Sequence, residues 1–143
     1  MILKRYALLG SALITLGLPI LAGADLITWN HTDQYSTVRI TSPGSHYCSA
    51  DNPFNEKTAP HNSSKTSIAQ VKTLCQVQPT QSICSVDVYA SAVCNEGMPP
   101  AQHIAHLDIN VKTLAVSNIV IDNPKYKISF DAPTVTVTID PVA

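Results

Sequence analysis

Two histidines in the second half of the chain are the residues best suited to bind a metal ion. His103 and His106 are three positions apart, and Met98 precedes them. Imidazole and thioether groups are ligands for zinc and copper. In a regular strand, positions three apart point to opposite faces, so both histidines could chelate one ion only if a β-bulge intervened. We therefore predict surface histidines, no metal site and no cofactor, with His103, His106 and Met98 kept as alternative metal ligands.

The motifs that usually identify an enzyme are absent from the sequence. It contains no Gly-x-Ser-x-Gly elbow, no His-Glu-x-x-His motif, no glycine-rich phosphate loop and no Cys-His nucleophile motif. A hydrolytic triad is a spatial arrangement that isolated residues do not establish. We predict a protein that is not an enzyme and has no catalytic residues, with a small secreted hydrolase or a hydrolase inhibitor as an alternative.

The N-terminus has the three parts of a cleavable export signal. Lys4 and Arg5 provide positive charge, residues 8–21 are mostly apolar, and Ala22-Gly23-Ala24 is a small-residue cleavage pattern. The apolar stretch is shorter than the roughly 20 residues that span a bilayer, and Pro19 interrupts it. We predict a signal peptide at 1–24, a single domain at 25–143, a secreted or periplasmic location and no stable membrane insertion.

Charge excludes a nucleic-acid partner for the mature chain. Without Lys4 and Arg5, seven of the nine basic residues remain against ten acidic ones. The seven are scattered, whereas proteins that bind nucleic acids cluster Lys and Arg to displace counterions from phosphates.

The four cysteines indicate a disulfide framework. All of them lie after the predicted signal peptide, and an even count is typical of small exported domains. The competing interpretation is a zinc site, but the sequence lacks the closely spaced cysteine pair of a zinc knuckle.

The mature chain alternates apolar and polar residues with period two, which is typical of β-strands. Turn-forming residues recur at short intervals and no long helical stripe occurs, so we predict an all-β fold. The predicted architecture is an antiparallel, immunoglobulin-like β-sandwich of about eight strands with two disulfides, and a closed barrel is the alternative. The predicted strands are 26–30, 35–41, 67–77, 83–90, 104–111, 114–121, 125–131 and 134–139, of which the first six pair in sequence, two by two.

The second predicted hairpin suggests how the cysteines pair. A two-residue loop at Pro79-Thr80 would place Cys75 opposite Cys84. Residues 85–90, which lie between Cys84 and Cys94, are predicted to be extended, so these two cysteines lie beyond the roughly 7 Å between Cα atoms that a disulfide permits. We predict the bridges Cys75–Cys84 and Cys48–Cys94, which contribute about 3 and 4 kcal/mol in the loop-entropy model.

Residues 42–66 form an unusually long polar segment between predicted strands. It contains Pro43, Gly44, Pro53 and Pro60 and carries several Asn and Ser residues. Loops of this length are usually either functional or disordered. We predict a binding loop whose contact residues are Tyr47, Asp51, Phe54 and His61, the alternative being a solvated loop held by Cys48.

Several segments resemble a group of small four-cysteine exported proteins from intracellular Gram-negative pathogens. They are residues 27–40, Cys84–Cys94, Asn123–Tyr126 and Val135–Ile139. The resemblance covers most of the mature chain, and its motifs are structural, so it assigns no activity to any residue. It implies release by type II secretion and a role outside the bacterium.

Together these observations predict an exported, non-enzymatic interaction protein. It would be a secreted virulence-associated factor that binds a protein or glycan partner, from the host or the envelope, through loops on a rigid scaffold. A periplasmic metal-binding protein is the alternative from a different class.

Overall fold

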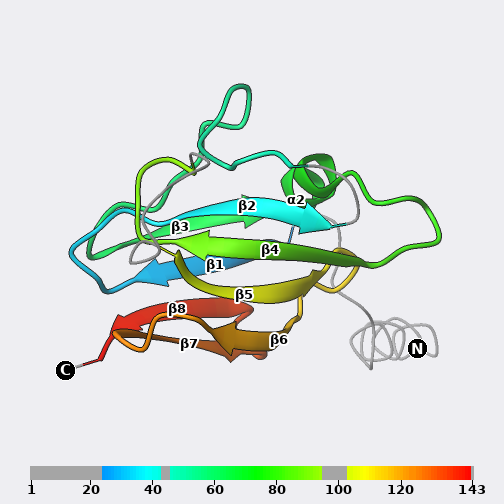
Figure 1. Cartoon of the computed structure of the whole chain (residues 1–143). Coiled ribbons are helices and arrows are strands. Elements are labelled where there is room, and N and C mark those ends of the chain that lie inside the picture. The colour runs from blue at the N-terminus through cyan, green and yellow to red at the C-terminus, as the bar shows by residue number, and fades with distance from the viewer. Residues whose placement is uncertain (1–23, 43–45, 95–102, 143) are drawn as a thin grey trace, which may run out of the picture.

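A computed structural model describes residues 24–42, 46–94 and 103–142, and these form a β-sandwich. Two four-stranded sheets face each other, one in the order β3-β1-β8-β7 and the other in the order β2-β4-β5-β6. The predicted sandwich of about eight strands with two disulfides is confirmed (Figure 1). The predicted signal peptide and Met98 lie outside the described residues. The elements are β1 (Asp25–Asn30), β2 (Thr37–Ser42), β3 (Asn62–Ser67), α2 (Ile68–Cys75), β4 (Ile83–Tyr89), β5 (His103–Asn110), β6 (Val116–Ile121), β7 (Tyr126–Asp131) and β8 (Thr136–Pro141).

The core lies between the inward faces of the two sheets. Alternation on β4 buries Cys84, Val86 and Val88 and directs the residues between them outward. Strand β8 does the same with Val137 and Ile139 on the opposing sheet. The buried apolar residues are almost all aliphatic, and their contact between the sheets is what stabilises the fold.

Most, but not all, neighbouring strands run antiparallel. The pair expected from residues 104–111 and 114–121 is present, because β5 pairs antiparallel with β6, and β7 and β8 form a further antiparallel pair. Strands β1 and β8 pair in parallel, so the prediction of wholly antiparallel sheets is wrong at this position.

The predicted opening hairpin is also wrong. Strands β1 and β2 follow each other in the chain but belong to different sheets. Strand β1 pairs instead with β3, which lies inside the segment predicted to be a loop. The short polar residues of β3 concealed it, because Ser63, Ser64 and Lys65 have no apolar alternation.

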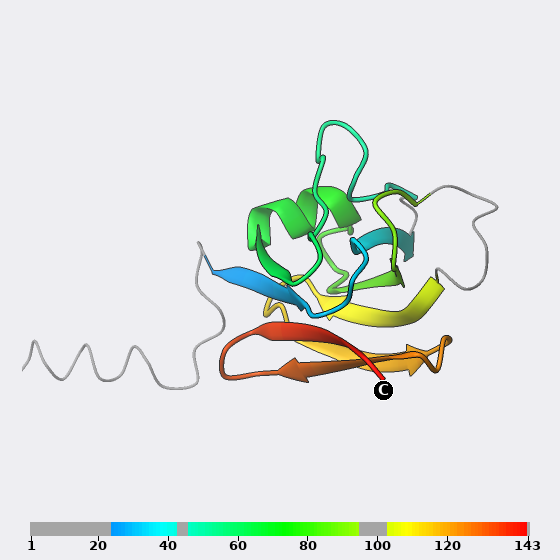
Figure 2. The same cartoon turned by 90° about the vertical axis from the view of Figure 1, so that its left-hand side faces the viewer.

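Residues 68–75 form helix α2 rather than the predicted strand. Ser67 caps the helix by accepting a hydrogen bond from the Gln70 backbone, while the Gln70 side chain accepts one from the Ser67 backbone N–H. This reciprocal capping box satisfies amides that the first turn would otherwise leave unpaired. Val71, Leu74 and Cys75 form the buried stripe. Helix α2 packs against β2 and β3, on the side of the molecule away from β7 and β8 (Figures 1 and 2).

Both predicted disulfides are present. Cys48 is bonded to Cys94 and Cys75 to Cys84, each pair with a Cα–Cα distance of 5.8 Å. The reason given for the second bridge was wrong, since Cys75 is at the end of α2 and not on a strand opposite Cys84. A left-handed Gln76 ends the helix and turns the chain back toward β4, so the two cysteines meet without a hairpin.

Candidate metal centre

A β-bulge in β5 brings His103 and His106 to the same face of their sheet. Opposite β4, Asp87 pairs with His106 and Val88 with Ala105, but Tyr89 pairs with His103. Ile104 is therefore an extra residue in β5, and both Ile104 and Ala105 are fully buried. The extra residue cancels the alternation that would otherwise separate the histidines. The β-bulge that both histidines need in order to face one ion is therefore present.

The backbone of Ile104 also positions a fourth polar residue. Its carbonyl accepts hydrogen bonds from the backbone N–H groups of Asp122 (2.8 Å) and Asn123 (3.0 Å). Asp122 directly follows β6, the strand next to β5. Three neighbouring strands thus contribute to one cluster, with Asp87 from β4, His103 and His106 from β5, and Asp122 from the end of β6.

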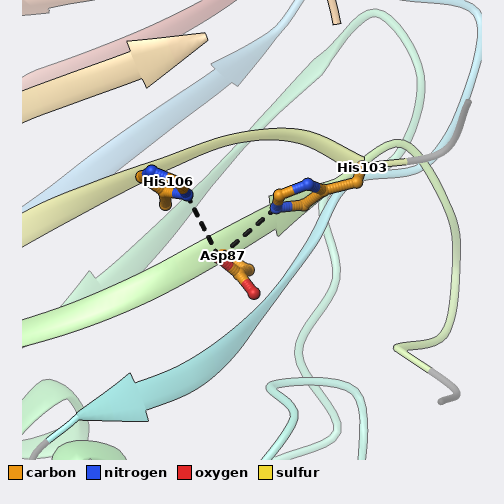
Figure 3. A group of neighbouring side chains, drawn as sticks. All are labelled: Asp87, His103 and His106. Carbon is orange, nitrogen blue, oxygen red and sulfur yellow. Dashed lines mark ion pairs between the residues drawn. The ribbon is translucent and has the colours of Figure 1, made fainter. Parts of the chain in front are cut away.

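The two histidines converge on Asp87 (Figure 3). Its Oδ1 atom lies 3.3 Å from His103 Nε2 and 3.7 Å from His106 Nδ1. Each of the three residues offers one ligand atom, and these atoms all lie within 4.8 Å of one another. A tetrahedral ion with bonds of about 2.0 Å separates its ligand atoms by about 3.3 Å, so two of the three separations are close to those of a bound ion.

Asp122 lies beside the Nδ1 atoms of both imidazoles. Its Oδ2 atom is 3.5 Å from His103 Nδ1 and 3.2 Å from His106 Nδ1. For His103 this arrangement gives one carboxylate to each ring nitrogen. A carboxylate on the far nitrogen of a metal-binding histidine fixes the tautomer and the ring orientation, which leaves Nε2 with its lone pair toward Asp87.

His103 Nε2 is buried and lacks a hydrogen bond. Among the described residues it is the one buried side-chain nitrogen or oxygen atom without a hydrogen-bond partner. Asp87 is near enough for an ion pair but is not oriented to accept a hydrogen bond. A buried polar atom without a partner is destabilising, and a metal ion between Nε2 and Oδ1 would satisfy both.

Tyr89 and Arg39 border the cluster. The Tyr89 ring is 5.3 Å from the His103 ring, measured between centroids. Burial, and then the charge of Asp87, raises the pKa of the Tyr89 hydroxyl, while Arg39 acts in the opposite direction through its charge and a side-chain hydrogen bond. The ordinary pKa of tyrosine, 10.0, already keeps the hydroxyl protonated near neutral pH, and the upward shift reinforces this, so Tyr89 is a neutral neighbour of the cluster.

The other histidines of the described chain that pair with carboxylates do so singly. His31 Nδ1 is 2.6 Å from Asp140 Oδ1, and His61 Nε2 is 2.6 Å from Asp33 Oδ1. Both contacts are hydrogen bonds at the surface. His61 was predicted as a contact residue of the binding loop, and its partner Asp33 lies in the connection between β1 and β2.

The predicted binding loop is held at several points. Cys48 is fixed by its disulfide and by an isolated β-bridge between its backbone and that of Arg39. A second isolated β-bridge joins the backbones of Thr58 and Ser36. Tyr47 and Phe54 meet edge to face, with 5.4 Å between ring centroids. Asp51 belongs to the turn between them, where its backbone N–H donates to the Cys48 carbonyl. The structure brings Tyr47 and Phe54 together, while His61 pairs with Asp33.

Neither Asp87 nor Asp122 stands out in the sequence as a candidate site residue. Asp87 is visible as a charged residue between Val86 and Val88, an outward position in a strand whose neighbours are buried. Asp122 follows the apolar end of β6 with no such pattern. Neither could be assigned to the histidines without the strand register.

Comparisons with known proteins agree on one family. The model of the family described as "NttC: T2SS substrate NttC" matches residues 1–140. The fold is similar to the crystal structure of the Legionella pneumophila type II secretion system substrate NttC, with a TM-score of 0.62 and 16% identity over 85% of this chain and 100% of that one. No curated protein matches the sequence. Within the described residues, no helix has the length and apolar character needed to cross a membrane.

Proposed function

The chain belongs to the NttC family of type II secretion substrates, and from that premise we propose that it binds one divalent transition-metal ion outside the cytoplasm. The ligands are Asp87 Oδ1, His103 Nε2 and His106 Nδ1. Asp122 is the outer carboxylate that orients His103. The predicted export signal at 1–24 and the oxidised cysteines fit this location.

The observation that carries the proposal is the buried Nε2 atom of His103, which has no hydrogen bond within the described chain and lies 3.3 Å from the Oδ1 atom of Asp87. Two imidazoles and one carboxylate favour Zn²⁺, Cu²⁺ or Ni²⁺ over Mg²⁺ and Ca²⁺, which prefer oxygen ligands. Three protein ligands leave at least one coordination position open.

The test is calorimetric titration of the protein recovered from the medium of secreting cells, after treatment with a chelator. We expect one saturable Zn²⁺ site per chain and no comparable heat with Mg²⁺. Asp87→Ala should remove the site, whereas Asp33→Ala, which removes a carboxylate from an isolated histidine pair, should retain it. Equal Zn²⁺ uptake by both variants would refute the proposal.

A second candidate function is binding of a host or envelope partner, protein or glycan, by the predicted loop. It is supported by the packed aromatic pair Tyr47 and Phe54, which lies on a segment fixed by a disulfide and by two isolated β-bridges of the backbone. Rigid aromatic side chains provide much contact area at low entropic cost. This role is the one expected of a virulence-associated factor.

The loop function is tested by measuring binding of labelled secreted protein to host cells. The double variant Tyr47→Ser/Phe54→Ser should lose binding that the wild type shows. Tyr35→Ser, which changes another exposed tyrosine, is the matched control and should keep it. Binding that survives the double variant would exclude the loop as the contact surface.

A further inference from the structure

A groove with both polar and apolar lining adjoins the candidate metal centre and shares two of its ligands. The groove has a volume of about 370 Å³, and Asp87 and His106 line it together with Ser85, Asp108, Asn118 and Val120. It therefore opens directly onto the ion that the three ligands would hold. A molecule in the groove could occupy the coordination position that the protein leaves open.

The position of the Asp108 carboxylate in this groove is fixed. Ser85 Oγ donates a hydrogen bond to Asp108 Oδ1 (2.6 Å) from β4, and Asn118 Nδ2 donates one to Oδ2 (2.8 Å) from β6. Asn118 adopts a positive φ of 52° where the pairing of β5 and β6 shifts register. Held from both neighbouring strands, the carboxylate keeps its place and has lone pairs left to accept further hydrogen bonds.

Asp108 and His106 are two positions apart on β5, so their side chains share a face. Two residues of a strand span about 7 Å. A ligand atom bound to the ion beside His106 would lie within reach of Asp108 if it carried a hydrogen. Phosphate and carboxylate groups bring no such hydrogen, and Asp87, Asp108 and Asp122 would repel them. A coordinated amine brings N–H donors and no negative charge.

We infer that this groove, together with the bound ion, takes a peptide N-terminus. Its amine loses one proton to solvent, coordinates the ion through nitrogen and donates its remaining N–H hydrogen bonds to Asp108, and its neutral amide oxygen takes a fifth coordination position to complete the chelate. The inference rests on the proposed metal function and specifies the ligand class of the same site. A free amino acid shares the amine but adds a carboxylate that the three aspartates disfavour.

The experiment uses the secreted protein loaded with Co²⁺, whose visible spectrum changes when a further ligand coordinates. Metal uptake is measured first, and glycinamide, glycine and acetate are then titrated separately. We expect glycinamide, which imitates a peptide N-terminus, to bind at least about tenfold more tightly than glycine, and acetate to bind most weakly. A site that takes up no metal would overturn both proposals, whereas metal uptake with equal affinity for the three probes would overturn this inference alone.

Variants of the groove separate its role from that of the ion. Asp108→Asn should retain Co²⁺ uptake but lose most of the preference for glycinamide. Asn118→Ala leaves the charge of Asp108 in place but removes the hydrogen bond that holds its carboxylate, and this variant should lose part of the preference for glycinamide. Asp131→Asn changes an exposed aspartate on β7 and should behave as the wild type. An unchanged preference in Asp108→Asn would contradict the inference.

Discussion

Histidine meets aspartate in two ways in this protein. His31 with Asp140 and His61 with Asp33 are isolated surface pairs, each closed by a hydrogen bond of 2.6 Å. In the cluster around His103 the nitrogen–oxygen separations run from 3.2 to 3.7 Å, and one buried nitrogen has no hydrogen bond among the described residues.

The difference shows what makes a histidine available to a metal. An isolated pair already satisfies the imidazole nitrogen it uses, so an ion would have to displace a good hydrogen bond. In the cluster, the bulge at Ile104 sets the groups at the spacing of a coordination shell rather than at hydrogen-bond distance. The local backbone, and not the residue types, separates the two cases.

Removing His103 should produce the largest effect. His103→Ala deletes the buried nitrogen that faces Asp87, and we expect Zn²⁺ affinity to fall by more than about 100-fold, since even outer groups contribute 10–100-fold. Calorimetry would measure it beside His61→Ala, which should bind as the wild type does. Similar losses in the two variants would abolish the distinction between cluster and pair.

Asp122 should have a smaller effect on the same measurement. Asp122→Asn keeps the size of the side chain but replaces the charged acceptor beside His103 Nδ1, and we expect a 10–100-fold loss of Zn²⁺ affinity. Asp140→Asn, which alters the partner of His31, is the control. An affinity unchanged by Asp122→Asn would show that the second carboxylate does not orient the ring.

The isolated pairs should matter little for stability. In a double-mutant cycle of His31→Ala and Asp140→Ala, urea unfolding should give a coupling energy of about 0.2–1 kcal/mol, the range of exposed ion pairs. A coupling energy of several kcal/mol would mean that the pair of His31 and Asp140 contributes substantially to the stability of the fold and is not an ordinary surface ion pair.

Glu56 shows the effect of burial without a neighbouring charge and should give the smallest change. It lines the margin of an apolar cavity of about 100 Å³ in the core, and burial raises its pKa above 4.5. The folded state then holds its proton more tightly than the unfolded state, so stability falls as pH rises from 4.5 through the raised pKa.

Glu56→Gln removes that penalty. At pH 7 we expect the Tm to rise by about 1–3 °C, a small gain because solvent screens a half-buried group, and the gain should vanish below pH 4.5. Thermal melts of both proteins across this range would measure it. A gain that persists below pH 4.5 would point to packing instead of charge.

The sequence predicted the sandwich because β-strand alternation survives wherever one face is buried. The prediction failed where this alternation is weak and where a helix has a similar apolar pattern. Strand β3 is built from Ser, Thr and Lys and has no alternation to detect. Residues 68–75 are short and apolar enough to resemble a strand, although the pair Ser67 and Gln70 carried the capping signal of a helix.

The candidate site could be predicted only in part. The spacing of His103 and His106 identified the ligands, and period two then argued against them. One inserted residue, Ile104, reverses that argument, and a bulge has no signature here beyond two adjacent buried residues. The carboxylates come from other strands and depend on register, which is a property of the whole sheet.

X-ray absorption at the zinc edge of the loaded, secreted protein tests the central claim most directly, because it counts the imidazoles bound to the ion. We predict two imidazole nitrogens and at least one oxygen at about 2.0–2.2 Å, with one imidazole lost in His106→Ala. A shell with fewer than two imidazoles, or one that His106→Ala leaves unchanged, would contradict the account.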